Sequence, residues 1–367
     1  MNSASSGEGG DIAGRKDDHL RLALHDEVEV TGPSRGWSAI GLVPRALPEL
    51  ALDDIDTSLT FLGKRLAFPL LVGSMTGGTD WAGELNRRLA RAAARAGIGM
   101  GLGSQRVMLK RPEARATFDV RAVAPDLPLL VANLGAVQLN YAVGAVDAAR
   151  LVEEVKADAL VLHLNAAQEA VQPEGDGDFR GLADKMRALA ATLALPVGVK
   201  EVGAGFVRAD LRRLVGDRCP FAFVESAGAG GTSWTLIEGK RAGAEQHPGA
   251  ALGELFADWG VPTVTSLLAC VEVLGDAVPV IASGGLRNGL DGARAIALGA
   301  RMTAMALPLL KAAAVSEDAA YDAMRAFERA LRTAMFLVGA KNLDALRRVP
   351  HRVPPELRPD RFEGGPA

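Results

Sequence analysis

From residue 69 onward, short apolar runs alternate with longer segments in which Ala, Leu and Arg recur at helical spacing. The apolar runs cover residues 69–73, 98–102, 129–133, 160–165, 197–201, 221–225, 278–283 and 302–306. The helical segments cover residues 81–96, 148–155, 179–193, 208–215, 263–274, 289–298 and 317–338. Strands that alternate with helices favour a parallel sheet, and continuously apolar strands favour a sheet that is covered on both faces.

Eight such strands predict that the sheet closes on itself. The expected fold class is therefore α/β, a (β/α)8 TIM barrel with an N-terminal extension. An open doubly wound sheet is the alternative. In that fold a GxGxxG turn usually follows the first strand, whereas residues 74–78 here read Ser-Met-Thr-Gly-Gly.

The two ends of the chain differ from this regular middle part. Residues 1–14 are rich in Ser and Gly, and we expect them to form a disordered leader. Residues 15–68 are expected to be an N-terminal extension, because a charged, helix-compatible stretch at 15–26 is followed by sequence with Pro and Gly punctuation. The barrel is expected to span residues 69–348, and the Pro-rich residues 349–367 are expected to form an irregular tail.

Composition narrows the class of protein. The 367 residues are 49% hydrophobic and 23% charged, which is typical of a globular protein. Net charge is −3 with Lys and Arg scattered, so nucleic acid is not an expected partner. No apolar run is long enough to cross a membrane and no signal-peptide pattern is visible, so a cytoplasmic protein is expected. Cys219 and Cys270 have no metal-binding spacing and are expected to be buried thiols.

Polar side chains follow most of the predicted strands. Because the carboxyl ends of parallel strands meet at one end of a barrel, these side chains are expected to surround a polar ligand. They are Ser74, Thr76, Ser104, Gln105, Asn133, His163, Asn165, Lys200, Glu225 and Ser226. A lysine at such a place could be a Schiff-base nucleophile or could stabilise an anionic ring system. The alternative for Lys200 is a salt bridge to Glu201 or Glu225.

Two glycine-rich loops are candidates for phosphate binding. Residues 283–286 follow the seventh strand and precede a helical segment, and Ala306 and Leu307 follow the eighth strand. Glycine lets backbone N–H groups approach an anion, and a helix N-terminus adds a favourable dipole. The loops after strands seven and eight are the recurrent phosphate site of barrels. A simple turn is the alternative, and residues 228–232 form a second such loop or the hinge of a lid.

Residues 160–176 combine an apolar strand with a polar end and a Pro-Glu-Gly-Asp turn at 173–176. The polar end consists of His163, Asn165, Gln168 and Glu169. Such groups would each need a buried partner inside a core, so the mouth of a barrel suits them better. Arg15, Lys16 and His19 lie outside the barrel repeat, and their residue types alone indicate a solvated charged segment.

Together these motifs resemble type 2 isopentenyl diphosphate isomerase, the FMN-dependent class. The matching segments are RKDDH at 15–19, SMTGG at 74–78, GSQR at 103–106, ANLG at 132–135, HLNAAQE at 163–169 with PEGD at 173–176, VKEVGAG at 199–205, GAGGTSW at 228–234 and ASGGLRNGLDGARAIALGA at 282–300. They follow the order of the family. HLNxxQE with PEGD is the specific part, whereas the GG-plus-helix element is shared by many FMN barrels.

The resemblance implies a barrel that holds FMN at the carboxyl ends of its strands, with Lys200 near the N1/C2=O edge of the flavin. The implied FMN-binding residues are Ser74, Met75, Thr76, Ser104, Asn133, Lys200, Thr232, Gly284, Gly285, Leu286, Ala306 and Leu307. It further implies that Arg15, Lys16 and His19 bind the substrate diphosphate, which revises the interpretation as a solvated segment. Gln168 would contact the substrate, Glu169 would bind Mg2+, and both would be catalytic together with His163.

The implied activity interconverts isopentenyl diphosphate and dimethylallyl diphosphate by a 1,3-allylic proton shift, in isoprenoid biosynthesis. A reduced flavin stacked on the alkene could stabilise a tertiary cation, and either flavin N5 or Gln168 could deliver the proton. Mg2+ with Arg and Lys suits a diphosphate. The flavin must be reduced although no net redox change occurs, so NADPH is the expected reductant. The family association suggests a homotetramer or larger homo-oligomer.

Two other functions stay open at this point. An α-hydroxyacid oxidase or dehydrogenase is also an FMN barrel, but it needs a catalytic His and an Arg pair near the sixth strand, and residues 226–232 contain neither. A non-catalytic flavin- or phosphate-binding protein would need no metal carboxylate such as Glu169. One departure from the family is Glu225, where Asp is usual. The longer side chain of Glu225 can alter the packing against Lys200, but the carboxylate is kept.

Overall fold

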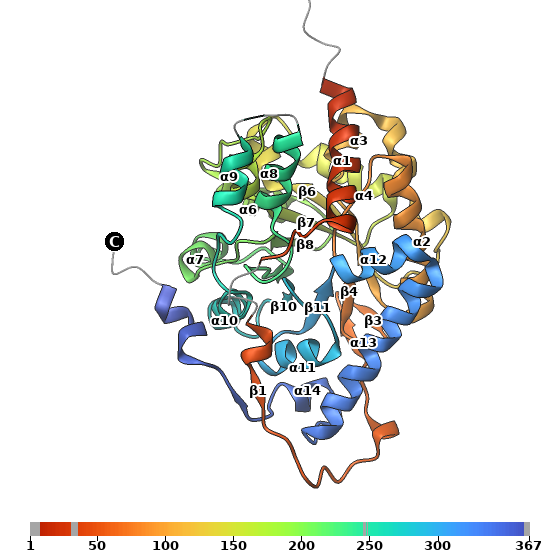
Figure 1. Ribbon diagram of the computed structural model, residues 1–367, viewed down its shortest axis with the longest axis vertical. Helices are drawn as coiled ribbons and strands as arrows, with labels where there is room; N and C mark the ends of the chain where they lie inside the picture. The colour runs from red at the N-terminus through yellow and green to blue at the C-terminus, as the bar shows by residue number, and fades with distance from the viewer. Residues whose placement is uncertain (1–7, 31–35, 245–246, 248, 363–367) are drawn as a thin grey trace, which may run out of the picture.

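A closed barrel forms the centre of the computed structural model, which describes residues 8–30, 36–244, 247 and 249–362 (Figure 1). Its strands are β4 Leu70–Val72, β5 Gly99–Gly101, β6 Leu130–Gly135, β7 Ala159–Leu164, β8 Val197–Glu201, β9 Phe223–Glu225, β10 Val280–Ala282 and β11 Met302–Met305. Within the described residues, these eight parallel strands close in the order β10-β11-β4-β5-β6-β7-β8-β9. Each strand overlaps one predicted apolar run. The predicted (β/α)8 barrel is confirmed, and the open sheet is excluded.

Helices surround the barrel in the described part of the chain. Seven overlap predicted segments: α2 Asp80–Ala96, α4 Ala145–Val155, α6 Leu182–Thr192, α7 Arg208–Val215, α10 Thr263–Leu274, α11 Gly289–Ala297 and α13 Glu317–Leu337. The others are α3 Arg106–Lys110, α5 Ala166–Val171, α8 Trp234–Ala244, α9 Gly249–Leu255, α12 Leu307–Val315 and α14 Leu343–Leu346. These were not predicted, because most are short or contain Gly or Pro and therefore carry a weak apolar period.

A hairpin closes the end of the barrel at which the strands begin. Its strands, β2 Leu59–Phe61 and β3 Lys64–Leu66, pair antiparallel, and the side chains of Phe61 and Leu66 are buried in the barrel interior. The rings of Phe61 and Phe223 meet edge to face, with centroids 5.9 Å apart. A Cβ on Gly198 would come within 2.3 Å of the Phe223 ring. Tight packing here leaves the carboxyl ends of the strands as the place for a ligand.

A helix begins within the expected disordered leader and runs into the N-terminal extension, which corrects part of that expectation. Helix α1 spans Glu8–His25, so residues 8–14 are helical, whereas residues 1–7 lie outside the described part. Leu20 and Leu22 are buried, and α1 packs against α2, α8 and α12 (Figure 1). Once packing has nucleated a helix, extending it by a few residues costs little.

The tail is partly ordered. Strand β12, His351–Arg352, pairs antiparallel with β1, Gly41–Leu42, and two 3-10 turns follow at Pro355–Leu357 and Pro359–Phe362. Residues 363–367 lie outside the described part. Cys270 is buried as expected, whereas Cys219 is only partly buried. None of the described helices is long and apolar enough to cross a membrane.

Candidate active site

A cavity of about 240 Å³ opens at the carboxyl ends of the barrel strands, and α1 contributes one of its walls. Every site residue that the family resemblance implied lines this one cavity. They are Arg15, Lys16, His19, Ser74, Met75, Thr76, Ser104, Asn133, His163, Gln168, Glu169, Lys200, Thr232, Gly284, Gly285, Leu286, Ala306 and Leu307. The structure therefore brings together residues from every part of the predicted motif set, while their individual roles stay predictions.

One wall is a cradle of backbone groups at the ends of β10 and β11. Gly284 and Gly285 have φ angles of 83° and 77°, which residues with a side chain rarely adopt. Ala306 precedes α12 without a side-chain cap. Among the described residues, none accepts a hydrogen bond from the backbone N–H groups of Gly284, Gly285, Leu286, Ala306 and Leu307. These donors and the positive end of the α12 dipole suit an anion such as phosphate.

The second glycine loop packs directly on the first. A Cβ on Gly285 would lie 1.9 Å from the carbonyl oxygen of Gly230, so the two loops approach backbone to backbone. The segment after α1 pairs with the same loop: Val30 N–H donates to the Gly231 oxygen, and Ser233 N–H donates to the Val28 oxygen, both at 2.8 Å. Backbone contacts on two sides therefore hold residues 228–233 in place, which favours the interpretation as a phosphate-binding loop over that of a free hinge.

Asn133 and His163 face each other at the ends of β6 and β7. Asn133 Nδ2 donates to the Leu102 carbonyl oxygen at 3.0 Å, which leaves its Oδ1 to His163 Nδ1 at 2.8 Å. His163 Nδ1 therefore carries the proton, and Nε2 is the unprotonated nitrogen. Burial, and then the charge of Lys200, lower the pKa of His163 to about 3, so the ring is neutral at physiological pH.

Lys200 forms the salt bridge that the sequence left open. Its Nζ lies 2.9 Å from Glu225 Oε1, both side chains are buried, and Lys200 still lines the cavity. The longer Glu225 reaches the ammonium group directly. A lysine held by a carboxylate provides a fixed positive charge, which suits the stabilisation of an anionic ring better than nucleophilic attack.

Lys16 is a half-buried cation without a carboxylate partner among the described residues. Its Nζ donates to the Ser104 carbonyl oxygen at 3.0 Å and lies 5.1 Å from the centre of the Phe118 ring. Burial, and then the charge of Arg15, lower the pKa of Lys16 to about 7. A desolvated ammonium group of this kind gains strongly from an anionic ligand. The interpretation of residues 15–19 as a solvated segment is therefore wrong, because α1 crosses the mouth of the barrel.

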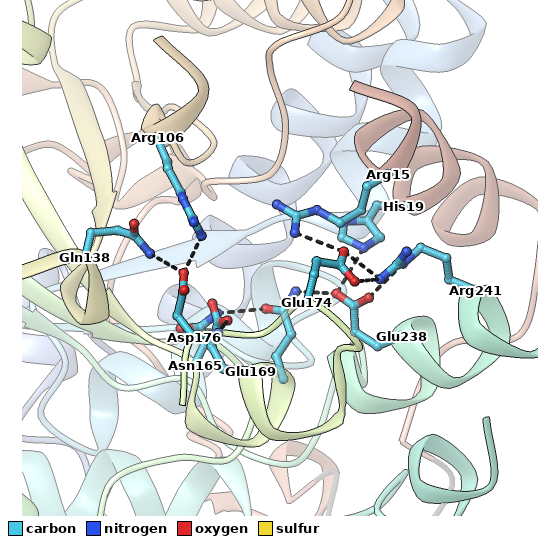
Figure 2. A network of polar contacts seen from close by, with 11 residues as sticks. Arg15, His19, Arg106, Gln138, Asn165, Glu169, Glu174, Asp176, Glu238 and Arg241 are labelled. Carbon is cyan, nitrogen blue, oxygen red and sulfur yellow. Dashed lines mark hydrogen bonds and ion pairs between the residues drawn. The ribbon is translucent and has the colours of Figure 1, made fainter. Parts of the chain in front are cut away.

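A buried network around Glu238 connects α1 with α5 and α8 (Figure 2). Glu238 Oε1 accepts a hydrogen bond from Gln168 Nε2 at 2.7 Å and lies 3.0 Å from His19 Nε2. Its Oε2 pairs with Arg241 Nε at 3.1 Å. Burial would raise the pKa of Glu238, but the charge and hydrogen bond of His19, with Gln168 and Arg241, bring it down to about 2.

Glu174 extends this network to the edge of the cavity. Both of its carboxylate oxygens lie 2.7 Å from Arg241 Nη2, and Oε1 lies 3.2 Å from Arg15 Nη1. Glu238, Arg241 and Glu174 were missed from the sequence. A Glu and an Arg three positions apart on a helix usually form an exposed pair, and only their nearness to the GAGGTSW motif could have indicated otherwise.

Glu169 is held by its neighbours with one edge toward the cavity. Its Oε1 accepts from Asn165 Nδ2 at 2.9 Å, and its Oε2 accepts from the backbone N–H of Asp176 at 2.7 Å. Burial is the main cause that raises the pKa of Glu169. The buried Oδ1 of Asn165 has no hydrogen-bond partner among the described residues. A carboxylate and an unpartnered amide oxygen therefore lie together on the cavity wall.

Two residues expected at the mouth are structural instead. Gln105 is completely buried away from the cavity, where it accepts from Asn133 N–H at 3.0 Å and donates to the Leu151 oxygen at 3.3 Å. Ser226 is completely buried as well. Across the described residues, no three His, Cys, Asp or Glu side chains gather as a complete metal site.

Solved structures share this architecture. A mandelate oxidase variant with 2-hydroxy-phenylacetamide is 21% identical, with a TM-score of 0.62 over 95% of this chain and 99% of that chain. A second variant with a monooxide FMN adduct gives 21% and 0.63, over 92% of this chain and 100% of that chain. At this identity the likeness concerns the fold alone.

The family model described as FMN-dependent dehydrogenase matches residues 13–115 and 256–351. The matched parts contain the phosphate cradle and the first two barrel strands. The unmatched middle part contains residues 160–176 and α8, with the network of Figure 2 largely inside it. Gln168, Glu169 and Glu238 therefore lie in the part of the chain that the family model does not match.

Curated relatives match almost the whole chain. Proteins named isopentenyl-diphosphate delta-isomerase are 44% identical in Nostoc sp., over 95% of this chain and 97% of the relative, and 48% identical in Paracoccus zeaxanthinifaciens, over 92% and 95%. A third, from Rickettsia felis, is 45% identical over 92% and 96%. The resemblance seen in the motifs is confirmed by this full-length similarity, and the chain belongs to the type 2, FMN-dependent isopentenyl-diphosphate delta-isomerase family.

Proposed function

We propose that this protein interconverts isopentenyl diphosphate and dimethylallyl diphosphate with reduced FMN and Mg2+ bound in the cavity, as a step of isoprenoid biosynthesis. One observation carries the proposal. The cavity has a backbone phosphate cradle on one wall and a separate set of cationic side chains with a carboxylate on another. Two anion sites in one cavity fit a phosphorylated cofactor and a diphosphate substrate held side by side.

FMN fits the barrel end of the cavity. Its phosphate would be held by the backbone N–H groups of Gly284, Gly285, Leu286, Ala306 and Leu307, with Thr232 beside them. Ser74, Met75, Thr76, Ser104 and Asn133 would line the ring. Lys200 would supply positive charge near it, which favours an anionic reduced flavin. When bound, the reduced cofactor supplies an electron-rich ring that can stabilise a cationic allylic system and exchange protons with it.

The substrate diphosphate fits the wall formed by α1. Lys16 lacks a carboxylate partner among the described residues, so a diphosphate would provide its missing counter-charge. Arg15 and His19 lie on the same helix face, each held by a carboxylate of the network, Glu174 and Glu238 respectively. Planar guanidinium and imidazole groups fixed in this way can bind phosphate oxygens with little loss of side-chain entropy.

Mg2+ fits beside Glu169. The cation prefers hard oxygen ligands and usually keeps several waters together with substrate phosphates, so one protein carboxylate is sufficient. Glu169 supplies that carboxylate, and the unpartnered Asn165 Oδ1 is a second hard oxygen at the same place. The absence of a three-residue metal cluster from the described chain agrees with a metal that arrives with the diphosphate.

Gln168 and His163 both line the cavity, and we propose that they face the reacting part of the substrate. Gln168 donates to Glu238, which fixes its amide orientation, and its Oε1 lies 3.2 Å from Asn165 Nδ2. His163 stays neutral, so we propose that it holds substrate or flavin by hydrogen bonds and does not act as the acid. The deeply buried Glu238 anion can stabilise positive charge that develops nearby.

The proposed reaction requires a reductant for the flavin. We propose NADPH as the reductant, because the reaction itself leaves the flavin oxidation state unchanged and an oxidised flavin must first be reduced.

A homotetramer or larger homo-oligomer is supported by exposed apolar side chains on and after α9, with Leu255 at 75% and Trp259 at 62% exposure. We also propose that the protein works in the cytoplasm.

An α-hydroxyacid oxidoreductase is the second candidate, because the family model and the mandelate oxidases share the fold. The loop after β9, residues 226–232, contains neither His nor Arg, so it lacks the groups that would bind and deprotonate a hydroxyacid there. The proton-handling groups of this chain lie instead on β7, α5 and α8, next to a cationic diphosphate site. This arrangement favours the isomerase.

The test is a direct assay of purified holoprotein. With FMN, Mg2+ and NADPH under anaerobic conditions, isopentenyl diphosphate should be converted to dimethylallyl diphosphate, as measured by mass-spectrometric separation of the two isomers. Mandelate with an electron acceptor serves as the competing substrate. Conversion of mandelate without any isomerisation would replace the isomerase by the oxidoreductase.

A further inference from the structure

Asp176 joins three residues that line the cavity, although Asp176 itself does not line it. Its carboxylate forms an ion pair with Arg106 and accepts a hydrogen bond from Gln138 Nε2 at 2.8 Å (Figure 2). Its backbone N–H donates to Glu169 Oε2 at 2.7 Å. One residue of the Pro-Glu-Gly-Asp turn therefore touches both a cavity arginine and the candidate metal ligand.

The turn is built to bring Asp176 to this position. A Cβ on Gly175 would lie 1.9 Å from the Glu169 carbonyl oxygen, so only glycine lets the turn press against α5. The preceding Glu174 binds Arg15 and Arg241, and therefore faces a different part of the network. The side chains of Arg106 and Asp176 are 25% and 14% exposed, so their ion pair is largely shielded from water.

We propose that Asp176 is a positioning residue for the diphosphate and Mg2+ site, acting through Arg106 and Glu169. This inference rests on the proposed function for the identity of the substrate. The Asp176 carboxylate holds the Arg106 guanidinium against the cavity wall, and its N–H fixes one oxygen of Glu169. The other edge of Glu169 and the free donors of Arg106 are then oriented toward the same diphosphate.

The charge of Asp176 matters as well as its shape. Asp176→Asn would keep a polar side chain of the same size but would remove the negative charge that pairs with the Arg106 guanidinium. Outer partners that orient a metal ligand typically contribute about 10- to 100-fold to metal affinity or activity.

The experiment measures binding separately from turnover. Calorimetric titration of the FMN-loaded protein with inorganic pyrophosphate in the presence of Mg2+ gives the affinity of the anion site, and FMN absorbance gives cofactor content. For Asp176→Asn, which keeps the shape and the backbone N–H, we expect an affinity loss of roughly tenfold or more with full FMN content. Asp176→Ala should lose more. Asp178→Asn is the matched control, because it removes a carboxylate from an exposed pair with Arg180 in the same segment.

A double-mutant cycle identifies the partner through which Asp176 acts. If it acts through Arg106, the affinity loss of Asp176→Asn combined with Arg106→Ala should be clearly smaller than the sum of the two single losses. Additive losses, wild-type affinity of Asp176→Asn, or parallel loss of FMN and pyrophosphate binding would each overturn the inference. Failure of the wild type to isomerise isopentenyl diphosphate would instead count against the proposed function alone. The Asp176 dependence of pyrophosphate binding would still support the positioning role.

Discussion

At the scale of single residues, the charged side chains in and around the cavity differ in whether they have a partner of opposite charge. Glu238 is surrounded by donors, Lys200 is paired with Glu225, and Lys16 has no carboxylate partner among the described residues. The sequence identified Lys16, Gln168 and Glu169 through motif resemblance. It could not identify Glu238 or Arg241, because a buried ion pair and a solvated one look the same in a helical sequence. Burial depends on what α1 and α5 place over them.

Glu169 tests the assignment of the metal ligand. Replacement of Glu169 by Gln should lower Mg2+-dependent isomerisation by more than about 100-fold, because even outer partners of a metal contribute up to that amount. FMN content should stay at the wild-type value, since Glu169 lies away from the phosphate cradle. Steady-state rates over a Mg2+ series and the flavin absorbance measure the two effects. Equal loss of both would contradict the assignment.

Lys200 tests the flavin-facing charge. Lys200→Ala removes the cation and leaves the buried Glu225 carboxylate without its partner, a change that typically costs several kcal/mol, roughly 3–5. We therefore expect weaker FMN retention or a more negative flavin reduction potential. The double variant Lys200→Met with Glu225→Gln is the control, because it removes both charges and restores stability without restoring the positive field. Unchanged FMN binding and reduction in both variants would mean that Lys200 has another role.

The lowered pKa of Lys16 predicts how diphosphate binding depends on pH. Its pKa is lowered to about 7 in the ligand-free protein, and a bound diphosphate would favour the charged form. Binding should therefore take up a proton in the pH range between about 7 and the ordinary 10.5, and affinity should fall as the pH rises through that range. Calorimetry in buffers of different ionisation enthalpy measures the uptake. Lys16→Gln should abolish this part of it, and identical uptake in both proteins would refute the prediction.

At the scale of elements, the regular parts of the barrel were predictable and the connections were not. Apolar runs identified all eight barrel strands, because a strand buried on both faces has few sequence alternatives. Helix α8 was missed, since its two glycines, Gly239 and Gly243, interrupt the apolar period. Helix α1 was predicted only from Arg15 onward, and its position over the cavity depends on packing against α2, α8 and α12.

The contact between the two glycine loops provides an element-scale prediction. Gly285→Ala would place a Cβ 1.9 Å from the Gly230 oxygen at a φ of +77°, so the loops must separate and FMN binding should be lost. Gly63→Ala is the matched control, because Gly63 has a φ of +74° with no atom within 4 Å of its Cβ position. The control should lose only the cost of the backbone conformation, about 1–2 kcal/mol, and keep FMN. Fluorescence titration with FMN and denaturant unfolding check both, and retention of FMN by Gly285→Ala would contradict the cradle.

At the scale of the whole molecule, one end of the barrel is closed by packed side chains and the other end carries the candidate active site. The hairpin β2–β3 fills the end where the strands begin, and the carboxyl ends carry the cavity. The N-terminal extension contributes to both ends of the barrel. It supplies the hairpin at one end, and the segment paired with residues 231–233 and the cationic wall of the site at the other. From the sequence, the helix-compatible stretch at 15–26 and the implied diphosphate-binding residues could be predicted, but the hairpin and the segment paired with residues 231–233 could not, because their structure comes from contacts with the barrel.

In the proposed function, the reduced flavin promotes an isomerisation without net redox change. The most direct measurement reduces the enzyme-bound FMN once, anaerobically and without NADPH, and then adds isopentenyl diphosphate with Mg2+ while product and flavin absorbance are followed together. We expect many molecules of dimethylallyl diphosphate per FMN, with the reduced flavin spectrum regained when the mixture reaches equilibrium. No product, or product formed only in proportion to flavin that becomes oxidised, would contradict it.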